Sequence, residues 1–96
     1  MRDVFVWPTV HNILWQKLEK TAYETVAKRL IEQLETRYDH WRQRRHPDDE
    51  SLFVYTLHLA DGEHWHTFEF HVDDTTADTC VIVLDVIHKL GKSRMK

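Results

Sequence analysis

Hydrophobic residues follow two different spacings along this chain, and the spacing changes near residue 50. Before that point, apolar side chains recur every three or four residues, which is typical of amphipathic helices. After it, they alternate with polar side chains, which is typical of strands. The pattern therefore predicts helices followed by a β-sheet.

A short β-prone run over residues 4–7 precedes the helical part and stops at Pro8, which predicts a first strand. We expect Thr9 to cap a first helix. The apolar residues of this helix share one face: Val10, Ile13, Leu14 and Leu18.

A second helix is predicted from Thr21, because Thr21 and Glu24 have the spacing of a capping box. Pro47 and the acidic residues after it end the pattern. The apolar stripe of this helix consists of Tyr23, Val26, Ala27, Leu30, Leu34, Tyr38 and Trp41.

Residues 52–59 are rich in β-forming side chains and predict a second strand. The pair Asp61-Gly62 then predicts a hairpin, because glycine tolerates a positive φ. In the third strand, residues 64–72, alternation separates two faces. One face carries His66, Phe68, Phe70 and Val72, and the other, half-solvated face carries Trp65, Thr67, Glu69 and His71.

After a polar turn over residues 73–78, residues 80–87 are apolar almost throughout. This composition predicts a central strand covered on both faces. Residues 88–96 follow as a short basic tail. Cys80 lies at the start of the apolar run, where a small buried hydrophobe is favoured over a reactive thiol.

The order strand, helix, helix, strand, strand, strand predicts an α+β fold: a helical hairpin packed on one face of a mostly antiparallel sheet. The length of 96 residues indicates a single domain over residues 1–96. The opposite face of the sheet, with Trp65 and Thr67, is left for solvent, a partner or a substrate.

The formal net charge of −3 counts against tight nonspecific binding of nucleic acid. With one cysteine, no apolar stretch of membrane-spanning length and no signal-peptide pattern, the chain is expected to be cytoplasmic and not associated with a membrane. Two basic clusters are candidate nucleic-acid contacts: Arg42, Arg44 and Arg45 beside Trp41, and Lys89 and Lys92 in the tail. The other interpretation of the arginine cluster is a solvated helix end.

The order strand, helix, helix, strand, strand, strand within 96 residues resembles the RelE/ParE toxin superfamily over nearly the whole chain, and the best local match is the last third. The matching residues are the strand and acidic turn over residues 70–74, the apolar strand over residues 81–87, and the terminal pair His88 and Lys89. The resemblance implies a toxin that is held inactive by a cognate antitoxin protein. Members of the RelE type cleave messenger RNA on the ribosome, whereas members of the ParE type inhibit DNA gyrase.

RNA cleavage needs a base, an acid and a cation. The candidates here are His64, His66 and His88 for the proton transfers, with Lys89 or Arg94 as the cation; the other interpretation is that these are ordinary sheet histidines. The arginine that RelE-like members carry on a middle strand has no counterpart, and His64 and His66 stand nearest its place. The missing arginine and the negative net charge favour a branch of the family that inhibits a cellular enzyme or is degenerate.

His64 and His66 also have the spacing of two metal ligands on one face of a strand, with His58 or His71 as a third. His71 falls on the opposite face by alternation, and no second cysteine is present. We therefore predict no metal and no cofactor.

Four tryptophans are many for one small core, and Trp15, Trp41 and Trp65 are candidate contacts for a partner. The partner is either an antitoxin segment or a second copy of the chain, which would form a homodimer. An alternative function is therefore a non-catalytic protein-interaction domain that uses an exposed aromatic sheet face.

Overall fold

The structure, a computed structural model, describes residues 3–61, 64–76 and 79–92, with only the backbone described for Asp61 and Lys92. Within these ranges it is an α+β fold with three helices and a four-stranded mixed sheet. The elements are β1 (Asp3–Val6), α1 (Pro8–Lys17), α2 (Lys20–Thr36), α3 (Tyr38–Trp41), β2 (Leu52–Asp61), β3 (His64–Asp73) and β4 (Cys80–Lys92).

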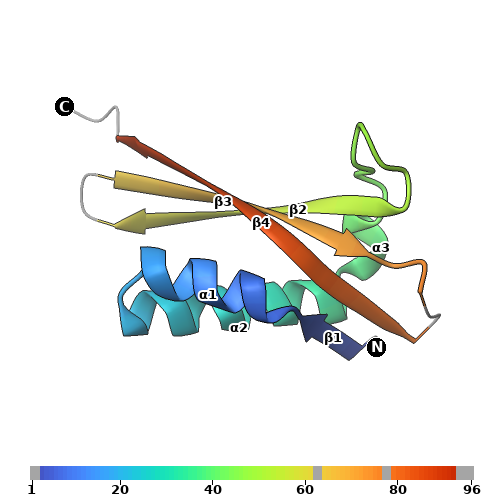
Figure 1. The fold of residues 1–96 in the computed structure, drawn as a ribbon, viewed down its shortest axis with the longest axis horizontal. Coiled ribbons are helices and arrows are strands. Elements are labelled where there is room, and N and C mark those ends of the chain that lie inside the picture. Colours follow the sequence, from blue (N-terminus) through green and yellow to red (C-terminus); the bar gives the residue numbers. More distant parts are fainter. Residues whose placement is uncertain (1–2, 62–63, 77–78, 93–96) are drawn as a thin grey trace.

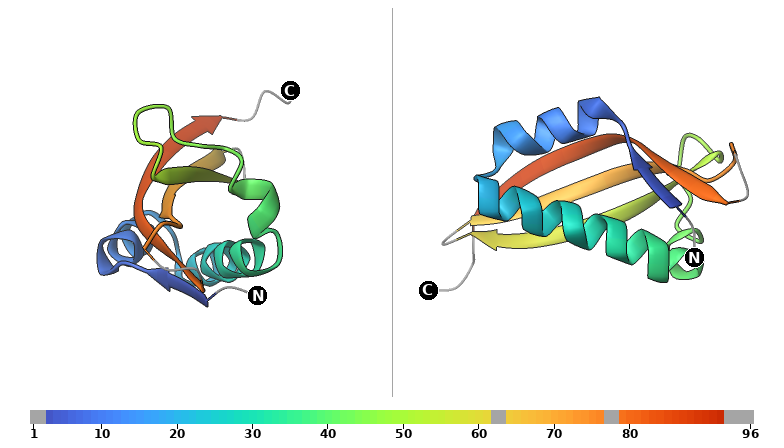
Figure 2. Two further views of the ribbon diagram at one scale, coloured as in Figure 1. Left: turned by 90° about the vertical axis from the view of Figure 1, so that its right-hand side faces the viewer. Right: turned by 90° about the horizontal axis from the view of Figure 1, so that it is seen from below.

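The sheet order is β1-β4-β3-β2, so the first and last strands of the chain are neighbours (Figure 1). β1 runs parallel to β4, and the other two pairings are antiparallel. The long helices α1 and α2 lie side by side on one face of the curved sheet (Figure 2). The predicted α+β class and the placement of the helices on one face are confirmed, and the other face is open.

Both helix starts differ from the prediction. α1 begins at Pro8, whose missing N–H suits the first turn of a helix, and Trp7 rather than Thr9 is the N-cap. α2 begins at Lys20 with Glu19 as its N-cap, and no side chain bonds the cap. The capping box at Thr21 is therefore wrong. The Thr21 carbonyl instead accepts a hydrogen bond from the Thr25 hydroxyl, 3.0 Å away, within the helix.

The long second helix of the prediction is divided in two. α2 ends at Thr36, Arg37 has non-helical backbone angles, and α3 then adds one short turn. The apolar stripe nevertheless continues across the break, because Tyr38 and Trp41 of α3 pack against the same core. Residues 44–46 follow as an extended segment along the free edge of β2, where Arg45 forms an isolated bridge with Phe53.

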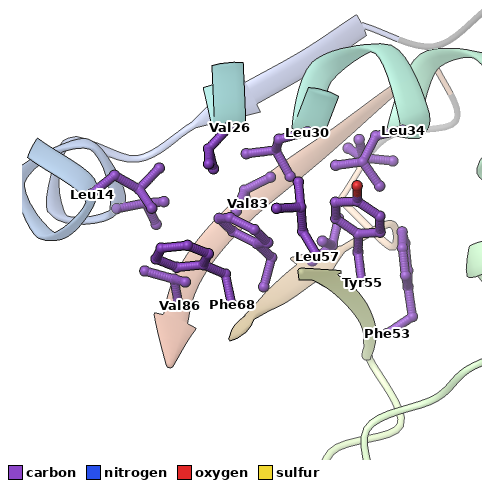
Figure 3. Close-up of a cluster of buried hydrophobic side chains, with 14 residues drawn as sticks. Leu14, Val26, Leu30, Leu34, Phe53, Tyr55, Leu57, Phe68, Val83 and Val86 are labelled. Carbon is purple, nitrogen blue, oxygen red and sulfur yellow. The ribbon is translucent and has the colours of Figure 1, made fainter. Parts of the chain in front are cut away.

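The core lies between the helices and the sheet, where the buried side chains form one cluster (Figure 3). The predicted faces of the helices and of β3 are the buried ones. The buried hydrophobic residues are Val10, Leu14, Val26, Leu30, Leu34, Phe53, Tyr55, Leu57, Phe68, Phe70, Val72, Val81, Val83 and Val86.

β4 differs from its prediction in length and in cover. It extends to Lys92, so most of the expected basic tail is strand. Its position between β1 and β3 is central, but only one face is buried: Ile82 and Leu84 are half-buried on the other side and Ile87 is 41% exposed. The covering of both faces is therefore wrong. Cys80, at the start of the strand, is a half-buried free cysteine.

A bulge in β4 changes which residues face the core. Val83 pairs with Val72 and Asp85 pairs with His71, so Leu84 is an extra residue in this strand. Alternation therefore places Val81 and Val83 on the core side before the bulge, and Val86 and His88 on the same side after it.

The core makes a testable distinction between neighbouring residues of α2. Leu30 is 1% exposed and Ile31 is 36% exposed. We expect Leu30→Ala to lower the free energy of unfolding by about 2–5 kcal/mol, because it leaves a cavity between the helix and the sheet.

Ile31→Ala, the control, should cost less than ~1 kcal/mol, because the Ile31 side chain is already partly exposed and alanine is a better helix former than isoleucine. Urea unfolding followed by circular dichroism measures both. Equal losses for the two variants would contradict the placement of α2.

Candidate functional site

Two of the predicted catalytic histidines are in contact, one near the start of β3 and the other near the end of β4. His66 on β3 and His88 on β4 project from the same face of neighbouring strands, and Nδ1 of His66 lies 2.9 Å from Nε2 of His88. The rings are roughly parallel, 5.1 Å apart, and His88 also stacks on Phe68 at 4.8 Å. His66 is 7% exposed and His88 is half-buried.

The contact between the two rings restricts their protonation. One ring donates an N–H and the other accepts it, so at least one of the facing nitrogens carries no proton. The pKa of His88 is lowered from its usual value, mainly by burial and further by the nearby positive charges of His66 and Lys17. Lys17, the last residue of α1, lies near enough for its charge to act on His88, which sequence spacing did not indicate.

The other predicted catalytic residues do not join the pair. Lys89 lies on the opposite face of β4, where its Nζ is 3.2 Å from the Glu69 carboxylate. The grouping of Lys89 with His88 is therefore wrong, because neighbouring residues of a strand point to opposite faces. His64 is exposed at the first residue of β3. Arg94 lies outside the described residues.

The described part of the chain offers no third ligand for a zinc site at His64 and His66. His58 lies on the open face of β2, where its ring nitrogen is 3.1 Å from the Thr67 hydroxyl. His71 lies on the same open face of β3, with its ring 4.7 Å from that of His46. Among the described residues, no group of three metal-ligating side chains converges.

The three predicted nucleic-acid-binding arginines have different surroundings. Arg45 forms two hydrogen bonds to the Asp74 carboxylate, at 2.9 and 3.0 Å, and the Tyr38 hydroxyl donates a third at 2.7 Å. These bonds, and the charge of Arg45, hold the pKa of Asp74 below its usual value despite burial. Arg45 therefore ties the segment after α3 to the turn after β3, and its guanidinium is not a free phosphate contact.

Arg42 and Arg44 are exposed and lie over aromatic rings. The Arg44 guanidinium is 4.9 Å from the centre of the Trp41 ring, and that of Arg42 is 5.6 Å from the Tyr38 ring. Lys89 of the second basic cluster is paired with Glu69. The side chain of Lys92 lies outside the described part of the chain.

The predicted partner-binding tryptophans divide into exposed and packed. Trp15 on α1 is 58% exposed and Trp65 on the open face of β3 is 45% exposed. In the pairing register, Trp65 stands between Ala60 and Gly91, so small residues flank the indole. Trp41 instead packs against the core, with its ring 4.6 Å from that of Tyr55. Trp41 is therefore mainly structural.

Comparison with known protein families, with curated proteins and with solved structures finds no match. Of the helices in the described ranges, none combines the length and the apolar character needed to span a bilayer.

The lowered pKa of His88 predicts a loss of stability on mild acidification. Between about pH 7 and about pH 5.5 the unfolded chain takes up a proton near the ordinary histidine pKa, whereas folded His88 resists it. The free energy of unfolding should therefore fall as pH falls through this window. The lowered pKa of Asp74 acts only below about pH 4, so the two effects separate.

His88→Gln should remove much of this pH dependence, whereas His40→Gln, an exposed change on α3, should leave it unchanged. Chemical denaturation at each pH measures the effect. A profile that is the same for the native chain and His88→Gln would contradict it.

The ion pair between Arg45 and Asp74 predicts a difference in stability between two arginine variants. The Asp74 side chain is 4% exposed, so removing its cation leaves a poorly solvated carboxylate. Since Arg45 is itself 35% exposed, solvent reduces the effect, and Arg45→Met should cost about 1–3 kcal/mol.

Arg44→Met removes the same charge without breaking an ion pair and should cost less than ~1 kcal/mol. Thermal unfolding of the two variants side by side measures the difference. If Arg45→Met were no more harmful than Arg44→Met, the ion pair would have no role in stability.

Proposed function

We propose that this chain is a toxin of the RelE/ParE type that arrests growth by binding a protein target, such as a cellular enzyme, and is neutralised by an antitoxin protein. The helices on one face of the sheet and a terminal strand carrying His88 and Lys89 support the family comparison. The observation that favours protein binding over RNA cleavage is the 2.9 Å contact between the rings of His66 and His88.

That contact works against RNA cleavage by the predicted histidines. Attack of a 2′-hydroxyl on phosphorus places the base and the acid on either side of the reacting phosphate. Two rings in direct hydrogen-bond contact leave no space between them for a phosphate group. The expected cation Lys89 is also on the other face of β4, bound to Glu69.

Large apolar side chains on the surface support protein binding. Trp15 is exposed on α1, and Trp65 is exposed on the open face of the sheet. Aromatic residues contribute a large share of the binding energy at protein interfaces when water is excluded around them. Trp65, flanked by Ala60 and Gly91, has room for a partner to pack against both sides of its ring.

A second candidate function is the ribonuclease, and the observation that favours it is the pair formed by His66 and His88, with the charge of Lys17 close enough to act on His88. The lowered pKa of His88 keeps this ring neutral near pH 7, as a general base requires. Lys17 would then supply the positive charge for the phosphorane. In this mechanism the two rings must separate before the substrate enters.

Expression of the chain in a bacterium separates these functions. We expect growth arrest that persists when His64→Ala, His66→Asn and His88→Asn are combined, because the histidines do not carry the activity. Trp65→Ser should relieve the arrest by removing a binding contact, whereas His58→Ser on the same sheet face should not.

Culture growth and the integrity of cellular RNA are the two measurements, with circular dichroism to verify that each variant folds. Arrest with fragmented RNA that is abolished in the histidine variant would select the ribonuclease. If the native chain causes no arrest but forms a stable complex with a protein, the interaction domain without toxicity would be selected.

A further inference from the structure

The surface formed by Arg42, Arg44, Tyr38 and Trp41, here called the arginine face, has two cations that pair with no carboxylate of the described residues. Among the described residues, the ion pairs of the chain involve Arg45 and Lys89 but neither Arg42 nor Arg44. Both side chains are exposed. Their N–H groups are therefore available to an anion from outside the chain.

The rings beneath these guanidinium groups are held in place. Trp41 packs edge-on against Tyr55 at 4.6 Å, and its Nε1–H donates to the Gln33 side chain at 3.4 Å. The Tyr38 hydroxyl donates to Asp74, and the Tyr38 ring lies 5.9 Å from that of Phe53. A guanidinium stacked on a fixed ring loses less freedom on binding than a free side chain, so the arginine face is pre-organised.

The neighbouring residues distinguish between two kinds of anion. Single-stranded nucleic acid binds by stacking its bases on open aromatic faces. Here Trp41 and Tyr38 are half-buried, and Arg44 and Arg42 lie over them. The acidic residues 48–50 also follow closely in the chain and repel a polymer that is charged at every nucleotide.

We infer that the arginine face binds a carboxylate-rich segment of a protein partner, with Asp or Glu side chains bonded to the N–H groups of Arg42 and Arg44. Guanidinium and carboxylate match in a two-point geometry that a lysine does not offer. A peptide can also place neutral residues where residues 48–50 lie. The inference rests on the proposed function only in taking the occupant to be a protein.

The test is fluorescence anisotropy with two labelled probes: a twelve-residue peptide of alternating Glu and Ala, and a single-stranded RNA of matched charge. The native chain should bind the peptide more tightly than the RNA. Arg42→Met with Arg44→Met should weaken peptide binding at least about tenfold, because charge-assisted hydrogen bonds are lost.

Arg42→Lys with Arg44→Lys keeps the charge and should still weaken binding severalfold, since the two-point geometry is lost. Lys20→Met with Lys28→Met, an equal loss of charge on exposed positions of α2, is the control and should have little effect. Binding that depends only on net charge, or RNA bound more tightly than the peptide, would overturn the inference. Because no growth assay is involved, failure here leaves the proposed function standing.

Discussion

The side of the sheet that each residue of β4 occupies is set by one extra residue, Leu84, and the remaining structure depends on it. Val81, Val83 and Val86 are all buried, although a regular strand could not place all three on one face. Without the bulge, Asp85 would face the core. Burying an unpaired carboxylate costs several kcal/mol, so the bulged register is strongly favoured. On the open side, the Asp85 carboxylate accepts the Val86 N–H at 2.8 Å.

The same register decides which chemistry is possible at the end of the sheet. Because His88 follows Val86 on the core side, it meets His66, and Lys89 is carried to the opposite face. A histidine and a lysine that are adjacent in the chain thus act in different surroundings: one ring is desolvated among aromatic side chains, and one ammonium group is in solvent beside Glu69. A terminal His-Lys pair on a strand is therefore not a single functional unit.

Periodicity along the chain was sufficient to predict the two long helices, the strands and the buried faces of α1, α2 and β3, because burial of apolar area determines both. It did not predict the helix starts, since no side chain caps α1 or α2. The bulge was missed because residues 80–84 are uniformly apolar and only Asp85 interrupts the run, so there is no regular alternation in which an extra residue would stand out. The pairing of Arg45 with Asp74 joins residues that are 29 positions apart, which no local pattern reports. The charge of Lys17 likewise acts on His88 only because α1 packs on β4.

The parallel pairing of β1 with β4 also affects how the chain is made. Among the described residues β1 pairs with β4 alone, and on the ribosome β4 emerges after the other elements described here, so β1 has no strand partner until then. During that interval Val4 and Val6 have no strand to pair with, while the β2–β3 hairpin can already form from nearby residues. The β1–β4 pairing thus joins segments that are far apart in the sequence, and it can form only after the residues of the β2–β3 hairpin are already available to pair with each other.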